Sequence, residues 1–127
     1  MEEKRKITVM YSNVQDNEPP KVIDIEDELD NYYKLLKCDD IEIVQRQVGF
    51  NTYCFVIDGC GRLKAKQRTS SMSLQDSRYG IVGNLIVTGL SDEEGNLTSL
   101  TPAQIKELNN FFIPVQGKDY KVLIQRW

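Results

Sequence analysis

The chain has 127 residues, of which 40% are hydrophobic and 28% charged, and its formal net charge is −3. These values are typical of a single globular domain and exclude a disordered chain, a coiled coil and a disulfide-rich miniprotein. The sequence contains no histidine. That absence excludes Ser-His-Asp and Cys-His triads, histidine-ligated zinc and a histidine general base, which are the commonest routes to hydrolysis.

The three cysteines, Cys38, Cys54 and Cys60, do not have the spacing of a metal-binding or redox pair. Their odd number, and the absence of an apolar run behind residues 1–6, predict a reduced, cytoplasmic protein. The most apolar stretch, residues 81–90, is shorter than the about 20 residues that a membrane-spanning helix needs. We therefore expect no metal, no cofactor and no membrane partner.

Charge is unevenly distributed along the chain. Residues 1–44 carry 6 cations and 12 anions, residues 45–88 carry 6 cations and 2 anions, and residues 89–127 carry 4 cations and 5 anions. The negative net charge of the chain argues against nucleic-acid binding, because phosphate contacts need clustered positive charge. The basic middle third fits an anionic ligand, or the acidic first third of another copy, and so predicts a homo-oligomer.

Hydrophobic periodicity predicts the elements of the first half of the chain. Alternating residues predict strands at 6–11 and 21–25, which form a hairpin with a long loop. A helix is expected over 26–37, because acids lead it and lysines close it. Its apolar stripe consists of Leu29, Tyr32, Tyr33 and Leu36. Strands at 41–48, 52–58 and 62–66 then predict a three-stranded meander.

The second half begins with a hydroxyl-rich loop at 69–73. A strand is expected over 79–90, with a bend or bulge at Gly83 and Asn84, followed by a turn at 91–96. The segment Thr101–Gln104 has the pattern of a capping box with proline at the first helical position, so it predicts a helix to about Phe112. A last strand follows at 119–126. The predicted fold is α+β, a single domain with a mostly antiparallel sheet of about six strands and two helices packed on it.

Four segments carry a resemblance to a known family. They are Ile57–Leu63, Ile81–Gly89, Asp92–Gly95 and Ser99–Ile105. Together they resemble a small family of domains of unknown function from phages, prophages and conjugative elements of Gram-positive bacteria. The similarity covers about residues 20–112. The resemblance implies an accessory protein without a transferable catalytic motif, of the kind that disables a host component or sequesters a nucleotide immune signal.

A basic strip is the main candidate binding site. Its members recur at every second position, so on a strand they share one face. The strip consists of Arg62, Lys64, Lys66 and Arg68, to which Arg78 adds a further cation. It fits an anion such as a phosphate or nucleotide. The alternative, which the residue types favour, is the solvated face of an edge strand, where lysine protects against aggregation.

Two other features have competing interpretations. Asn84 lies within an apolar strand pattern, so it is either a structural residue at a bulge or a ligand contact. The carboxylates of residues 24–30 could bind a cation or act as acid and base, but acids at a helix start are commonly there for stability.

These observations favour a non-enzymatic binding protein of a mobile element that captures an anionic small molecule, such as a nucleotide-type immune signal. One alternative is an inhibitor that docks a host protein through its acidic first third. The other is an enzyme that uses carboxylates or lysine. No residue is assigned a catalytic or metal-binding role.

Overall fold

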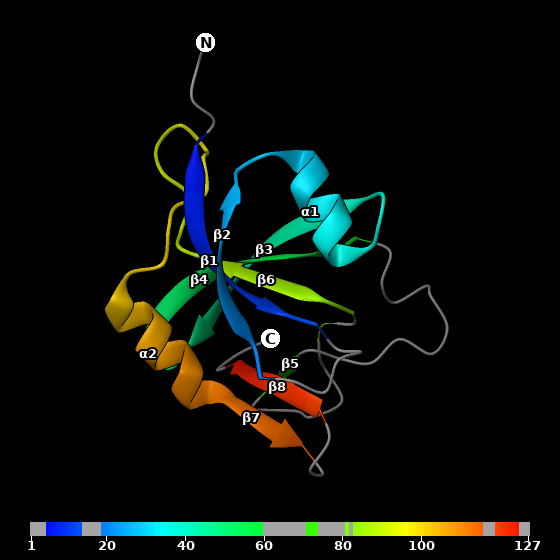
Figure 1. The fold of residues 1–127 in the computed structure, drawn as a ribbon. Helices are drawn as coiled ribbons and strands as arrows, with labels where there is room; N and C mark the ends of the chain where they lie inside the picture. Colours follow the sequence, from blue (N-terminus) through cyan, green and yellow to red (C-terminus); the bar gives the residue numbers. More distant parts are fainter. Residues whose placement is uncertain are drawn as a thin grey trace.

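The structure is a computed structural model (Figure 1), and it describes residues 5–13, 19–59, 71–73, 81, 83–115 and 119–124. Within these residues the chain forms two helices and eight strands. In chain order they are β1 (Lys6–Ser12), β2 (Lys21–Glu26), α1 (Leu29–Leu36), β3 (Ile41–Val48), β4 (Asn51–Asp58), β5 (Ser71–Ser73), β6 (Leu85–Thr88), α2 (Pro102–Phe111), β7 (Phe112–Val115) and β8 (Asp119–Ile124).

The larger sheet has five strands in the order β2-β1-β6-β4-β3, and all neighbouring strands are antiparallel. The predicted hairpin of β1 and β2 is confirmed, with Lys6 opposite Glu26. A second hairpin joins β3 to β4, and β6 lies between the two hairpins. The sheet is therefore built from two local hairpins that are joined by a strand from later in the chain.

The smaller sheet has the order β5-β8-β7, in which β8 is parallel to β5 and antiparallel to β7. The predicted last strand is confirmed as β8. Pro114 lies in β7, which is an edge strand, where the missing backbone N–H is tolerated. The turn of the chain from α2 into β7 takes place at Phe112, whose side chain is buried.

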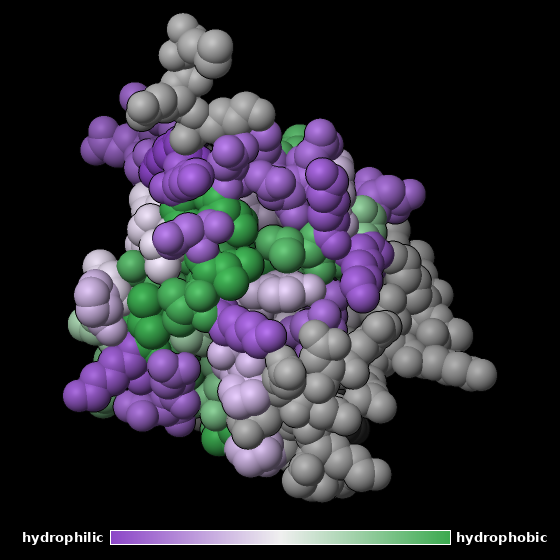
Figure 2. All heavy atoms as spheres, viewed as in Figure 1, coloured by the Kyte–Doolittle hydropathy of each residue, from purple (hydrophilic) through white to green (hydrophobic). Residues whose placement is uncertain are grey.

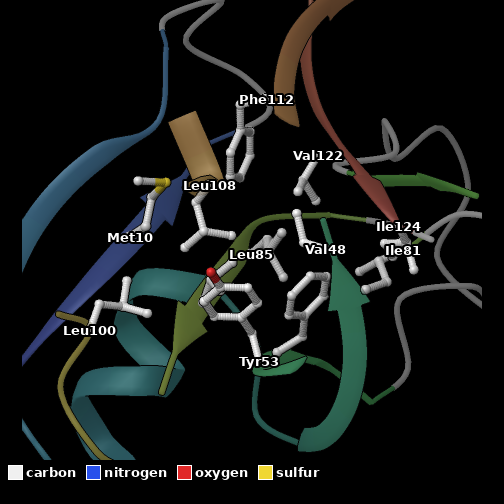
Figure 3. Close-up of a cluster of buried hydrophobic side chains, with 12 residues drawn as sticks. Met10, Val48, Tyr53, Ile81, Leu85, Leu100, Leu108, Phe112, Val122 and Ile124 are labelled. Carbon is white, nitrogen blue, oxygen red and sulfur yellow. The ribbon is translucent and has the colours of Figure 1, made fainter. Parts of the chain in front are cut away.

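Each face of the five-stranded sheet has its own hydrophobic core, because successive strand residues point to opposite sides. On one face, Tyr32 and Leu36 of α1 cover the sheet. On the other face, Leu108 of α2 and residues of β8 pack against it (Figure 3). Consecutive residues of β4 from Tyr53 to Val56 are all buried, so this strand belongs to both cores. The prediction of an α+β fold with a mostly antiparallel sheet and two helices is confirmed, although the strands divide into two sheets.

The first helix is shorter than predicted. Glu26 ends β2, and the backbone N–H of Asp27 donates to the Arg5 carbonyl at 2.8 Å, which extends the ladder between β1 and β2. The helix therefore starts at Leu29, whose side chain is 56% exposed, whereas Tyr32 is buried as predicted. Of the acids that were expected to lead the helix, Glu26 ends β2, Asp27 and Glu28 form the connection, and Asp30 lies in the first turn of α1.

Two strand predictions also change, and a third lies outside the described residues. Of the strand predicted over 79–90, the described residues 81 and 83–90 form a strand only in β6, because the backbone bends at Gly83, where φ is 91° and where a bend was predicted. The predicted loop at 69–73 includes β5. Residues 62–66, the expected third strand of the meander, lie outside the described residues, and the strand beside β4 over Cys54–Val56 is β6.

The capping box predicted for Thr101–Gln104 is confirmed. The Thr101 hydroxyl accepts from the Gln104 backbone N–H at 3.2 Å, and the Gln104 side chain accepts from the Thr101 N–H at 2.9 Å. This capping box starts α2 at Pro102. Cys54 is buried, while Cys60 lies outside the described residues.

Candidate ligand-binding groove

An open groove of about 460 Å³ lies where the end of β2 meets α1. This volume is within the about 300–1,000 Å³ that is usual for small-molecule sites. Residues from β1, β2 and α1 line it: Lys6, Asp24, Ile25, Glu26, Asn31, Lys34 and Leu35. A second open hollow of about 500 Å³ lies at the other end of α1, and Lys34 lines both.

The short connection between β2 and α1 shapes the groove. Only Asp27 and Glu28 separate the two elements, so the helix must start beside the strand that precedes it. The Asn31 side-chain nitrogen donates to the Glu26 carbonyl at 2.9 Å and ties the first turn of α1 to the end of β2. Lys34, one turn further along the helix, is thereby held on the same side.

A second tie fixes α1 against the sheet. The Tyr32 hydroxyl donates to a carboxylate oxygen of Asp27 at 2.7 Å. Burial of the phenol, followed by its hydrogen bond to Asp27 and the charge of that carboxylate, raises the pKa of Tyr32 well above its usual value of 10.0. Tyr32 therefore stays neutral and serves as a fixed hydrogen-bond donor to Asp27.

Opposite charges share the lining of the groove. Lys6 and Lys34 are exposed and supply two ammonium groups, while Asp24 and Glu26 supply two carboxylates. Asp24 already accepts a hydrogen bond from the Thr8 hydroxyl at 2.6 Å. Figure 2 shows hydrophilic residues gathered in the upper part of the view, where α1 lies, above a band of hydrophobic residues. The groove therefore combines cations, anions and an apolar part, which suits a ligand with several kinds of group.

Asn84 lies behind this groove and not in its lining. The side chain is 5% exposed, and its nitrogen donates to the Leu35 carbonyl at 3.1 Å and to the Tyr11 hydroxyl at 3.3 Å. The Tyr11 hydroxyl also donates to the Leu35 carbonyl at 2.7 Å. This carbonyl lies in the last turn of α1, where no helical N–H reaches it. Asn84 thus satisfies the helix end, and its assignment as a ligand contact stays a prediction.

The other site residues predicted from the sequence lie outside the described residues. They are Arg62, Lys64, Lys66, Arg68 and Arg78. The structure instead brings together Lys6 and Lys34, which the sequence analysis did not select. No motif connects these two lysines, and the one usable signal was the predicted hairpin, which places Lys6 beside the start of the helix.

A second polar cluster holds the end of the β3–β4 hairpin against α2. The Glu107 carboxylate accepts hydrogen bonds from the Tyr53 hydroxyl at 2.6 Å, the Asn51 amide at 2.8 Å and the Phe50 backbone N–H at 3.1 Å. Burial raises the pKa of Glu107, but these donated hydrogen bonds outweigh burial and hold the pKa below 4.5. The three donors occupy this carboxylate, so its role is to fix the hairpin.

Among the described residues, no three His, Cys, Asp or Glu side chains gather in a way that could hold a metal ion. The helices of the described part are also too short and too polar to cross a bilayer.

A family model matches residues 7–113, which include both helices and every strand of the larger sheet except the first residue of β1. The chain belongs to the DUF3846 family. The family is described as a domain of unknown function, which confirms that part of the resemblance. The DUF3846 match begins at Ile7, before the predicted limit of residue 20, and it ends in β7. No curated protein and no solved structure matches the chain significantly.

Proposed function

We propose that this protein is a non-catalytic binding protein for an anionic small molecule of the nucleotide type, held in the groove between β2 and α1. The observation that carries the proposal is the approach of Lys6 and Lys34 to the same opening, from different elements, beside the apolar side chains of Ile25 and Leu35. Ammonium groups pair with phosphate, and an apolar surface receives the face of a ring.

The carboxylates in the groove narrow the class of ligand. Asp24 and Glu26 repel a bare polyanion, so inorganic phosphate alone is a poor ligand. A nucleotide carries N–H donors on its base as well as a phosphate, and these donors fit carboxylate acceptors. The Asn31 amide, which donates to the Glu26 backbone carbonyl at 2.9 Å, fixes the position of α1 relative to β2.

The biological setting of the proposal comes from the resemblance. An accessory protein of a phage or another mobile element, in the bacterial cytoplasm, would sequester a nucleotide immune signal by holding it in this groove. The proposal assigns no catalytic step, because the sequence has no histidine and the Glu107 carboxylate is occupied within the fold. The basic strip at residues 62–68 stays in the proposal as a second set of cations for the phosphate.

Thermal unfolding in the presence of nucleotides tests the proposal. The panel contains mononucleotides, cyclic dinucleotides, nucleosides and inorganic phosphate. A ligand at 100 times its Kd stabilises the folded state by about 2.7 kcal/mol. We expect nucleotides to raise the Tm and phosphate to leave it unchanged. Lys34→Gln abolishes the shift, while Lys106→Gln, a change on the exposed side of α2, keeps it.

Two further measurements separate the alternatives. The double variant Lys64→Ala and Arg68→Ala shows whether the basic strip adds to binding. Ligand recovered unchanged after denaturation indicates capture, whereas an altered product indicates an enzyme. If no nucleotide shifts the Tm, and a basic host protein instead binds in a salt-sensitive manner, the acidic first third is the functional surface.

A further inference from the structure

The open groove beside α1 follows the outer edge of β2. This strand ends the larger sheet, so on its outer side no described strand pairs with it. Ile25 packs with the core cluster on the sheet face that α1 covers, whereas Asp24 and Glu26 alternate to the other face. Residues of α1 and residues of that other face line the same groove, so the strand edge between them forms its floor.

The backbone of Asp24 points to this floor. Its partner in the β1–β2 ladder is Thr8. The Thr8 carbonyl accepts from the Leu100 N–H at 2.9 Å, and the Thr8 N–H donates to the Ser99 hydroxyl at 3.0 Å. Both backbone groups of Thr8 are therefore used on the side away from β2, so Thr8 and Asp24 are a non-hydrogen-bonded pair. In such a pair the N–H and C=O of Asp24 point away from β1, to the outer edge of β2.

Asp24 thereby presents one donor and two acceptors at the groove. The donor is its backbone N–H, and the acceptors are its backbone carbonyl and its exposed carboxylate. The Thr8 hydroxyl donates to the Oδ1 atom of this carboxylate at 2.6 Å and so fixes its position. Within the described part of the chain, the Oδ2 atom and the two backbone groups of Asp24 have no hydrogen-bond partner.

Guanine is the nucleobase that complements this set of groups. Its Watson–Crick edge carries one acceptor, O6, and two donors, N1–H and the N2 amino group. We propose that Asp24 selects a guanine base in the groove, with its N–H donating to O6 and its carbonyl and carboxylate accepting from N1–H and the N2 amino group. This inference rests on the proposed function and names the nucleotide class that the same groove takes.

The other common bases do not match all three groups. The Watson–Crick edge of adenine has one donor, the N6 amino group, and one acceptor, N1, so it leaves the carboxylate without a donor. Cytosine and uracil have the acceptor O2 where guanine has its N2 amino group, and that oxygen would face the carboxylate. A site whose polar groups stay unpaired rejects a ligand strongly, which makes the base the selective part of the nucleotide.

The remaining lining suits the rest of a guanine nucleotide. Ile25 and Leu35 offer an apolar surface to the purine ring, and the ammonium groups of Lys6 and Lys34 pair with the phosphate. These contacts are the same for every purine nucleotide. Discrimination between bases therefore falls to Asp24, and it can be measured separately from binding itself.

Calorimetric titration with nucleotides that differ only in the base tests the inference. The ligands are the 5′-monophosphates of guanosine, inosine, adenosine, cytidine and uridine, measured on the wild-type chain. Inosine monophosphate differs from guanosine monophosphate only by the missing N2 amino group. We expect guanosine monophosphate to bind about tenfold or more tightly than inosine monophosphate, and more tightly than the other three.

The possible results separate this inference from the proposed function. Equal affinity for all five nucleotides, or preference for another base, keeps the proposed function but overturns the assignment of guanine to Asp24. Binding of none of them overturns both.

An exchange of specificity tests Asp24 directly. Asp24→Asn replaces one carboxylate oxygen by an amino donor, and the remaining oxygen can still accept from the Thr8 hydroxyl. Xanthosine monophosphate carries an oxygen in place of the N2 amino group, so it fits the new donor. We expect the ratio of guanosine to xanthosine monophosphate affinity to fall about tenfold or more, with a gain in xanthosine monophosphate binding. A gain of binding requires a folded protein, so loss of the fold cannot imitate it.

Asp30→Asn is the matched control. It removes the same charge from an exposed position in the first turn of α1, outside the lining of the groove. It should change all affinities alike and keep the preference for guanosine monophosphate. An Asp24→Asn variant that keeps the wild-type preference overturns the inference, as does an equal loss of preference in both variants. If Asp24→Asn does not fold, the wild-type comparison of guanosine and inosine monophosphates still decides the question.

Discussion

The Tyr53 hydroxyl donates to the Glu107 carboxylate at 2.6 Å and thereby joins the buried centre of β4 to α2. The same carboxylate accepts from Asn51 and from the backbone of Phe50. The Glu107 side chain on α2 therefore binds Phe50 in the turn as well as Asn51 and Tyr53 in β4. This arrangement leads to the first two predictions.

Glu107→Ala should lower the free energy of unfolding by about 1–3 kcal/mol, because it leaves the Tyr53 hydroxyl without its close acceptor inside the core. Urea unfolding of Glu107→Ala, Tyr53→Phe and the double variant gives a double-mutant cycle. We expect a coupling energy of at least about 0.5 kcal/mol. Strictly additive effects would mean that the hydrogen bond contributes nothing to stability.

The stability should fall at acid pH partly through Glu107. Its folded pKa is lower than the value of 4.5 that it has when unfolded. The stabilisation is therefore fully present above about pH 4.5 and is lost as the pH falls through the lower folded pKa. Urea midpoints measured from pH 7 to about pH 2.5 should decline less steeply for Glu107→Gln than for the wild type. Glu94→Gln, at an exposed loop position, should follow the wild-type slope.

Gly49→Ala should destabilise the protein more than Gly95→Ala. Both glycines have positive φ, +64° and +85°, which costs about 1–2 kcal/mol for an alanine. A Cβ at Gly49 would also lie 2.7 Å from the Phe111 ring, whereas a Cβ at Gly95 meets nothing within 4 Å. The difference between the two unfolding free energies isolates the close packing of the turn on α2. Equal losses would show that the ring moves away without cost.

Asn84→Ala should destabilise the protein by about 1–3 kcal/mol, since it removes a buried donor to the last turn of α1. Asn110→Ala, at an exposed position of α2, is the control and should change stability by no more than about 0.5 kcal/mol. Hydrogen exchange should also quicken in α1 for Asn84→Ala. A stability equal to that of the wild type would leave the burial of this amide unexplained.

Sequence patterns predicted an element correctly where the contacts that determine its structure join residues close together in the chain. The capping box between Thr101 and Gln104 involves residues three apart. The limits predicted for β3 and β4, which are joined by a two-residue turn, are correct to within one residue. The start of α1 was placed too early because the acids that favour a helix start also suit the end of an edge strand. The pairing of Glu26 with Lys6 decided between them.

Features that depend on distant partners could not be predicted. The strand Ser71–Ser73 pairs with Val122–Ile124, and nothing in a polar three-residue segment indicates a partner so far along the chain. The groove also depends on residues that are far apart in the sequence, because Lys6 and Lys34 line the same opening only when α1 packs on the sheet. Asn84 did stand out in an apolar strand, but its acceptor at Leu35 became visible only in the fold.

The position of β6 has a consequence for the order of folding. The β1–β2 and β3–β4 hairpins each join neighbouring segments, so both require only short loop closures. No described strand other than β6 lies between them, and it ends at Thr88. Among the described strands, the two hairpins therefore share no ladder until that residue has been synthesised, and until then the nascent chain exposes one unpaired edge of β1 and one of β4.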